Sequence, residues 1–262
     1  MLLIESKYLD SHYCAGKTIF DKMLNSVGFN VSSTLLDAGS GNGCYSTAIS
    51  KIVGDKGKVV SIDINSDNLF SFKRTNEIST GFSIQANLIS IPMKENTVDG
   101  VWCSNVFQYL TENEKIQVLN EFKRIVKPGG KIAIKEVDLS TTMLGPSPRI
   151  FWHIVLKAMS SRQINSSLNM FNVLKYSRML NIQRISYKTY ILEWTSPIES
   201  KVFRYLHNLS GTIKEIFRQI PLSEEETFYL ENYIQVRENS DYVVSEDFYW
   251  REGYILILLQ NE

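Results

Sequence analysis

The residues most suited to chemistry lie in one short run, Asp37-Ala38-Gly39-Ser40-Gly41-Asn42-Gly43. The run follows an apolar segment, Thr34 to Leu36, and precedes a stretch of helical pattern from Cys44 to Val53. Glycines at a strand-to-helix junction permit a tight turn and let the backbone approach a ligand closely. We therefore expect a ligand-binding loop at the end of the first strand.

The acidic residues near this run restrict the ligands that it can bind. A dinucleotide pyrophosphate favours a helix N-terminus with no carboxylate beside it, and its G-x-G-x-x-G pattern needs a glycine where Cys44 stands. Asp37 repels phosphate and attracts an ammonium group. Asp63 ends the next apolar segment, where a carboxylate can accept hydrogen bonds from ribose hydroxyls. The pattern predicts a ligand with a nucleoside, an amino acid end and no phosphate.

Four segments, taken in order, resemble the class I S-adenosylmethionine-dependent methyltransferases of the bacterial small-molecule type. They are Leu35 to Gly43, Val59 to Ile64, Asn87 to Pro92 and Lys127 to Gly130. The resemblance implies that S-adenosyl-L-methionine is the cofactor, and that it is bound by Tyr8, Asp37, Gly39, Ser40, Gly41, Gly43, Asp63, Ile64, Asn87, Leu88, Ser104 and Asn105. Asn87 departs from the family, which usually has an acidic residue there, but an amide oxygen can accept the same hydrogen bond from the adenine amino group.

Methyl transfer from a sulfonium is an in-line displacement that depends mainly on orientation and on the exclusion of water. A base is needed only when the acceptor must lose a proton. The candidate catalytic residues are His12, Gln108 and Glu136. A structural role is open for each: a hydrogen-bonded core histidine, a polar residue at a helix start and a member of an ion pair, respectively. The carboxylates form no recognisable metal-binding set, so no metal is expected.

The charge of the chain narrows the choice of methyl acceptor. Its 262 residues hold 28 Lys and Arg and 28 Asp and Glu, a formal net charge of zero. A protein that follows a nucleic acid backbone needs a positive field, so this balance disfavours nucleic acid. We expect transfer to oxygen, nitrogen or carbon of a small apolar or aromatic metabolite. A tRNA or protein methyltransferase, and an S-adenosylmethionine-binding cyclase or regulatory protein that transfers no methyl group, stay open as alternatives.

Strands that alternate with helices must position these residues. This alternation predicts a Rossmann-like, doubly wound and mostly parallel sheet, because each crossover places its helix on a sheet face. The expected parallel strands are Thr34–Leu36, Lys58–Ile62, Phe82–Gln85, Val98–Cys103 and Lys131–Val137. Ile182–Trp194 and Phe248–Leu259 are expected to complete seven strands as a partly antiparallel pair.

We expect a single methyltransferase domain over residues 1–262, with 1–30 as an N-terminal helical cap and 33–137 as the cofactor-binding core. Residues 139–181 and 197–240 are expected to form helical lid insertions. In detail, the sequence predicts a loop over Leu139–Pro148 and helices over Arg149–Ser161, Leu168–Leu180, Pro197–Ile220 and Glu224–Val236.

The three cysteines form no CxxC pair, and no apolar run approaches the ~20 residues of a membrane-spanning helix. We therefore expect a cytoplasmic protein that acts away from the membrane. The sequence makes no prediction of oligomeric state.

Overall fold

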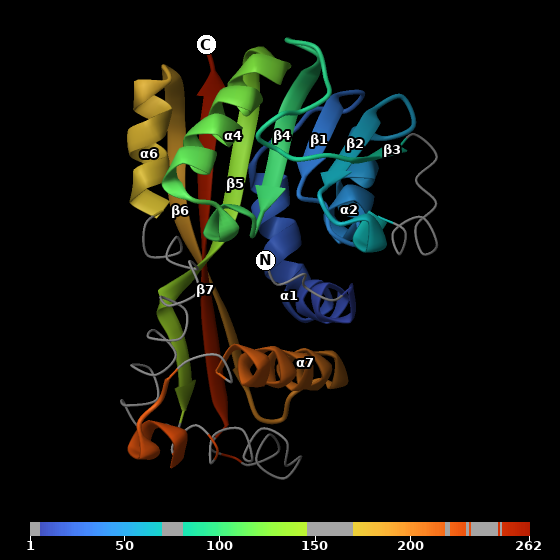
Figure 1. The fold of residues 1–262 in the computed structure, drawn as a ribbon. Helices are drawn as coiled ribbons and strands as arrows, with labels where there is room; N and C mark the ends of the chain where they lie inside the picture. Colours follow the sequence, from blue (N-terminus) through green and yellow to red (C-terminus); the bar gives the residue numbers. More distant parts are fainter. Residues whose placement is uncertain are drawn as a thin grey trace.

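The computed structural model describes residues 6–69, 81–145, 170–217, 221–228, 231, 246 and 248–262. Within these residues, seven strands form one sheet in the order β3-β2-β1-β4-β5-β7-β6 (Figure 1). The strands are β1 (Thr34–Ala38), β2 (Lys58–Asp63), β3 (Gly81–Gln85), β4 (Val98–Ser104), β5 (Val126–Gly145), β6 (Ile182–Thr195) and β7 (Tyr249–Asn261). The first five pair in parallel, and β7 is antiparallel to both β5 and β6. The predicted Rossmann-like, mostly parallel sheet is confirmed.

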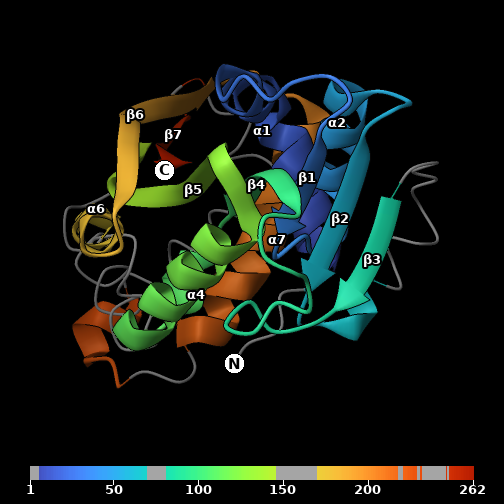
Figure 2. The same ribbon diagram turned by 90° about the horizontal axis from the view of Figure 1, so that it is seen from above.

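Helices cover both faces of the sheet, which explains why its central strands are apolar on both sides. Figure 2 shows α1 (Ser6–Ser26) and α2 (Cys44–Val53) on one side, and α4 (Glu112–Ile125) and α6 (Met170–Met179) on the other. Alternate residues of β1 divide between the two layers: Leu35 packs with Leu24 of α1, whereas Leu36 packs with Phe122 of α4. The core is therefore two apolar layers separated by the sheet.

Helix α1 bends, so that its two halves run in different directions (Figure 1). Eight residues of a straight helix rise ~12 Å, yet the rings of His12 and Phe20 lie 5.0 Å apart between centroids. A Cβ atom at Gly16 would lie 2.4 Å from the Phe20 ring, so glycine allows this contact. The second half of α1 packs on the sheet, and the first half reaches the glycine run at Gly41, where Leu9 is the nearest side chain.

The end of β5 corrects one expectation. Leu139–Pro148 was expected to be a loop, but β5 continues through Gly145 and pairs with β7, with Met143 opposite Arg251. Thr141 and Thr142 favour extended backbone because they are β-branched, and β7 supplies a long partner. Positions 146–148 lie outside the described residues.

Two later helices pack against the sheet and against α1. α6 confirms the helix expected over Leu168–Leu180, and it packs against β6 and α4 on the sheet face. α7 (Ser200–Phe217) confirms the helix expected over Pro197–Ile220, and it packs against α1. The helix expected over Arg149–Ser161 and most of the one over Glu224–Val236 lie outside the described residues. Among the described helices, none is long and apolar enough to cross a membrane.

Candidate functional site

The glycine run forms a tight loop between β1 and α2. Gly39, Gly41 and Gly43 have φ values of 71°, 53° and 81°, in the left-handed region that other residues rarely adopt. The Gly39 and Ser40 amides both donate to the carbonyl of Ile62, at 2.7 and 2.9 Å. We call residues 39–43 the glycine loop. It is fixed to the carboxyl end of β2, where the sequence predicted a ligand site.

Two buried carboxylates lie beside the glycine loop. Asp37 is 1% exposed at the end of β1 and accepts a 2.6 Å hydrogen bond from the Ser46 hydroxyl. Burial raises its pKa to about 7, and the nearby charge of Asp63 adds to the effect. Asp63 accepts from the Gly41 amide at 2.7 Å and from the Asn65 amide at 2.8 Å, and burial raises its pKa as well. A buried carboxylate in this state is stabilised by a positively charged ligand group.

Several polar atoms around the loop have no hydrogen-bond partner in the described part of the chain. They are Oγ of Ser40, Oγ of Ser104 and Oε2 of Glu136, all buried. Leaving a buried polar atom unsatisfied costs about 1–3 kcal/mol, so such groups point to a missing ligand or water. Together with the two carboxylates, these atoms fit a ligand that carries hydroxyl, ammonium and carboxylate groups, as a nucleoside linked to an amino acid does.

The residues expected around the adenine follow β2 and β3. Ile64 is 45% exposed, so its side chain is available to pack on a flat ring. The Ala86 amide donates to the carbonyl of Asp63 at 3.1 Å, which brings the two chain segments together. Asn87 uses its side-chain oxygen to accept from the Ile89 amide, and Leu88 is buried in the core. In this structure Asn87 therefore stabilises its own turn.

The segment after β4 lies against the glycine loop. A Cβ atom at Gly39 would lie 2.2 Å from a methyl carbon of Val106, so only glycine fits there. Oε1 of Glu136 accepts from the Val106 and Phe107 amides at 2.8 and 2.7 Å, and burial raises the pKa of Glu136 to about 7. Gln108 donates to the carbonyl of Asn105 at 3.2 Å. Gln108 and Glu136 thus hold this segment in place. The structural role expected for Glu136 was an ion pair, but its Oε1 atom instead accepts from backbone amides.

His12 belongs to a buried polar cluster that the sequence reading missed. Its Nε2 lies 2.8 Å from the Tyr254 hydroxyl, which lies 2.5 Å from Oε2 of Glu252. Oε1 of Glu252 accepts from the Tyr205 hydroxyl at 2.6 Å and from Nε1 of Trp250 at 2.8 Å. The one sequence signal was an acidic residue among the large apolar side chains of β7.

Lys135 connects this cluster to the segment after β4. The side chain is fully buried, and its Nζ donates to Oδ1 of Asn105 at 3.3 Å. Nζ also lies 4.3 Å from the ring centroids of both Phe20 and Tyr254. Burial lowers the pKa of Lys135 to about 7, opposed by the negative charges of Glu136 and Glu252. A lysine directly after the apolar run from Ile132 to Ile134 was the available signal.

The remaining expected residue, Tyr8, stacks on His12 with ring centroids 5.9 Å apart and contacts Tyr205. Burial and the charge of Glu252 raise the pKa of its hydroxyl. The structure therefore brings Tyr8 and His12 together on the first half of α1. Gln108 and Glu136 lie at the segment that follows β4, and Tyr254 and Lys135 link His12 to it.

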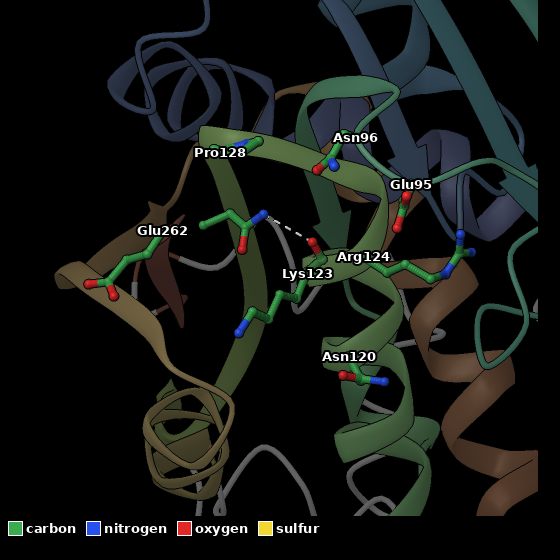
Figure 3. Close-up of a pocket in the computed structure, with 8 residues that line it drawn as sticks. Glu95, Asn96, Asn120, Lys123, Arg124, Pro128 and Glu262 are labelled. Atoms are coloured by element: carbon green, nitrogen blue, oxygen red, sulfur yellow. Dashed lines mark hydrogen bonds between the residues drawn. The ribbon is translucent and has the colours of Figure 1, made fainter.

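A cavity of about 480 Å³ lies elsewhere, at the amino end of the parallel strands (Figure 3). It is lined by Glu95, Asn96, Asn120, Lys123, Arg124, Pro128, Asn261 and Glu262. Asn261 donates to the carbonyl of Lys123 at 3.0 Å. Because the glycine loop is at the carboxyl end of the sheet, this cavity is separate from the site described above.

Comparison with known proteins gives a match to one family over the central part of the chain. Residues 36–134 match the family described as a methyltransferase domain. Over 111 residues the chain is 36% identical to the ubiquinone/menaquinone biosynthesis C-methyltransferase UbiE of Wigglesworthia glossinidia brevipalpis, covering 41% of this chain and 44% of that protein. The chain thus spans less than half the length of this curated relative.

Two solved structures have the same fold. One is a putative methyltransferase from Bacillus halodurans, with a TM-score of 0.58 at 15% identity, covering 93% of this chain and 99% of that one. The other is a geranyl diphosphate C-methyltransferase from Streptomyces coelicolor A3(2), solved with Mg²⁺, geranyl diphosphate and S-adenosyl-L-homocysteine. Its TM-score is 0.53 at 14% identity, covering 94% of this chain and 81% of that one.

Proposed function

We propose that this protein is a class I S-adenosylmethionine-dependent methyltransferase that transfers a methyl group to a small-molecule acceptor, as the match of residues 36–134 to a methyltransferase domain family supports. The observation that carries the proposal is the glycine loop, flanked by the buried carboxylates of Asp37 and Asp63. These two groups complement an ammonium group and a ribose, respectively.

In this proposal, different residues of the chain bind different parts of the cofactor. Asp37 pairs with the ammonium group, Asp63 accepts from the ribose hydroxyls, and Ile64 packs on the adenine. Ser40 and Ser104 hold the amino acid end, for which their unsatisfied hydroxyls are suited. When bound, S-adenosylmethionine supplies an electrophilic methyl group on a sulfonium. The protein's task is then to orient the acceptor and to exclude water.

For the acceptor, the surroundings of Lys135 favour a small apolar or aromatic molecule, methylated at oxygen, nitrogen or carbon. The rings of Phe20, Tyr45 and Tyr254 all lie within 5.8 Å of its Nζ atom. Aromatic walls with a few fixed polar groups are typical of small-molecule sites. The zero net charge argues against a nucleic acid acceptor.

A thermal unfolding experiment tests the cofactor. S-adenosylmethionine and S-adenosylhomocysteine are each expected to raise the melting temperature, whereas NAD is not. A ligand at 100 times its Kd stabilises a protein by about 2.7 kcal/mol. The variant Asp63→Ala is expected to lose most of this increase. An equal response to NAD, or an unchanged response in the variant, would contradict the proposal.

Transfer of a radiolabelled methyl group tests the reaction itself. The protein is incubated with methyl-labelled S-adenosylmethionine and a cell extract divided into small molecules, RNA and protein. Label is expected in the small molecules. Label in RNA or protein would identify a macromolecular methyltransferase, and cofactor binding without any transfer would identify a cyclase or a regulatory protein.

A further inference from the structure

The direction of the hydrogen bonds in the buried cluster fixes where His12 carries its proton. Glu252 accepts from three donors, including the indole of Trp250, which can only donate; such a set favours the ionised carboxylate. Tyr254 has a single hydroxyl proton, which it gives to Glu252. Its oxygen must therefore accept from Nε2 of His12, because the two atoms are only 2.8 Å apart.

A neutral imidazole with its proton on Nε2 has a lone pair on Nδ1. Within the described residues, nothing forms a hydrogen bond to Nδ1, although His12 is only 9% exposed. Nδ1 is thus a proton acceptor without a partner among these residues, held by a ring whose other nitrogen already bonds to Tyr254. This arrangement is the general form of an oriented base, in which a second group fixes the tautomer and stabilises the charged ring.

Charged and titratable groups face His12 from each of the described elements that pack on it. Lys135 of β5 faces it with a positive charge, and Glu252 of β7 faces it with a negative one, while Tyr8, Tyr205 and Tyr254 supply phenol groups. Burial and then Lys135 lower the pKa of His12 below its ordinary value. His12 is therefore neutral at pH 7 and able to accept a proton.

The position of His12 relative to the glycine loop follows from α1. The first half of this helix contacts the loop through Leu9, which is nearest to Gly41, and through Ser6, whose carbonyl accepts from Asn42 at 3.4 Å. On the other side, Tyr254 and Lys135 connect His12 to Asn105. His12 therefore lies between the glycine loop and the segment after β4.

We propose that His12, oriented by Tyr254 and Glu252, accepts the O–H or N–H proton of the methyl acceptor at its Nδ1 atom. The acceptor is accordingly a weak acid, such as a phenol or a heteroaromatic N–H compound. Its atom bonds to the methyl carbon as the carbon–sulfur bond breaks and that electron pair stays on sulfur. The acceptor's proton moves to Nδ1, and then to water. This inference rests on the proposed function; Tyr254 and Glu252 are positioning residues.

The tautomer of His12 is measured by nuclear magnetic resonance on protein labelled with ¹⁵N-histidine, with no ligand added. The signal is assigned by its loss in His12→Gln. At pH 7 we expect a protonated Nε2 and a bare Nδ1. Tyr254→Phe removes the group that accepts from Nε2 and is expected to give a mixture of tautomers. Tyr205→Phe is the matched control, because it removes a donor to Glu252 and keeps the ring beside His12; its tautomer is expected to be unchanged.

Three results would overturn the inference: a proton on Nδ1 in the wild-type protein, a charged imidazole at pH 7, or an unchanged tautomer in Tyr254→Phe. If that variant does not fold, the wild-type spectrum still decides the first two. The spectrum is independent of the cofactor, so a failed thermal shift with S-adenosylmethionine would refute the proposed function alone.

A second readout concerns the reaction. The rate of label transfer to small molecules is expected to fall at acidic pH along the protonation curve of His12 measured by resonance. His12→Gln is expected to lower this rate at least ~100-fold, the usual contribution of a general base, while the thermal shift with S-adenosylhomocysteine persists. A rate of methyl transfer that does not follow the protonation of His12 would overturn its assignment as the base.

Discussion

Replacing Asp37 by Asn tests whether a carboxyl group suited to ligand binding lowers the stability of the folded protein. The carboxyl group of Asp37 has its pKa raised from 3.8 to about 7 by burial. In the unfolded chain it ionises near 3.8, but in the folded protein it resists ionisation. Its stabilising contribution is thus complete below pH 3.8 and is lost as the pH rises through 7. At 1.36 kcal/mol per pKa unit, the full effect at pH 8 has an upper bound of about 4 kcal/mol.

The variant has no carboxyl group to ionise, and its amide oxygen can still accept from Ser46. We therefore expect Asp37→Asn to be more stable than the wild-type protein at pH 8, by roughly 1–4 kcal/mol, and the difference to shrink at pH 5. Urea unfolding at the two pH values measures it, and calorimetry is expected to show that S-adenosylmethionine binding is lost.

In the wild-type protein, the ammonium group of the cofactor favours ionised Asp37, so binding between pH 6 and 7 is expected to release a proton. Calorimetry in buffers of different ionisation enthalpy detects this release. A variant that is less stable than the wild type at pH 8, or a stability difference that does not depend on pH, would refute the reasoning.

Two other substitutions are informative. Gly39→Ala places a Cβ atom 2.2 Å from Val106 at a φ of 71°. It is expected to lower the free energy of unfolding by about 1–3 kcal/mol and to abolish the thermal shift with S-adenosylmethionine. Gly54→Ala is the control, because Gly54 has a similar φ of 68° but a Cβ atom there would lie 3.8 Å from the nearest atom. This variant is expected to keep the thermal shift. An equal loss of the shift in both variants would contradict the role of the contact with Val106. Lys135→Met removes an ammonium group whose pKa is lowered from 10.5 to about 7, so its burial destabilises the folded protein fully below pH 7 and not at all above pH 10.5. Urea unfolding is therefore expected to show a variant that is more stable than the wild type at pH 6, by a difference that fades towards pH 10. A stability difference that grows with pH would contradict this sign.

The sheet was predictable because its signals are local. β1, β2 and β4 are short apolar runs bounded by turns, and the glycine pattern after Leu36 requires a special backbone wherever it occurs. The extension of β5 beyond Asp138 was not predictable, since Ser140, Gly145 and Pro146 favour a loop until a long partner such as β7 is present.

The site was predictable in part, for a similar reason. Asp37 and Asp63 end their strands, so their meeting at the glycine loop follows from the parallel arrangement. The cluster around His12 does not, because Lys135, Tyr205 and Glu252 come from distant segments. Only the bend of α1 and the folding of β7 bring them together. Lys135 after an apolar run in β5 and Glu252 among the large side chains of β7 were all that the sequence showed of it.

The position of β7 also bears on the order in which the protein is made. This strand comes late in the chain, yet it lies inside the sheet, between β5 and β6. His12 meets Tyr254 across 242 residues, so α1 leaves the ribosome long before the strand that it contacts. In the described sheet, β1 to β4 pair only with one another and with β5. During synthesis, a nascent chain therefore has the elements of the cofactor loop long before it can assemble the His12 cluster.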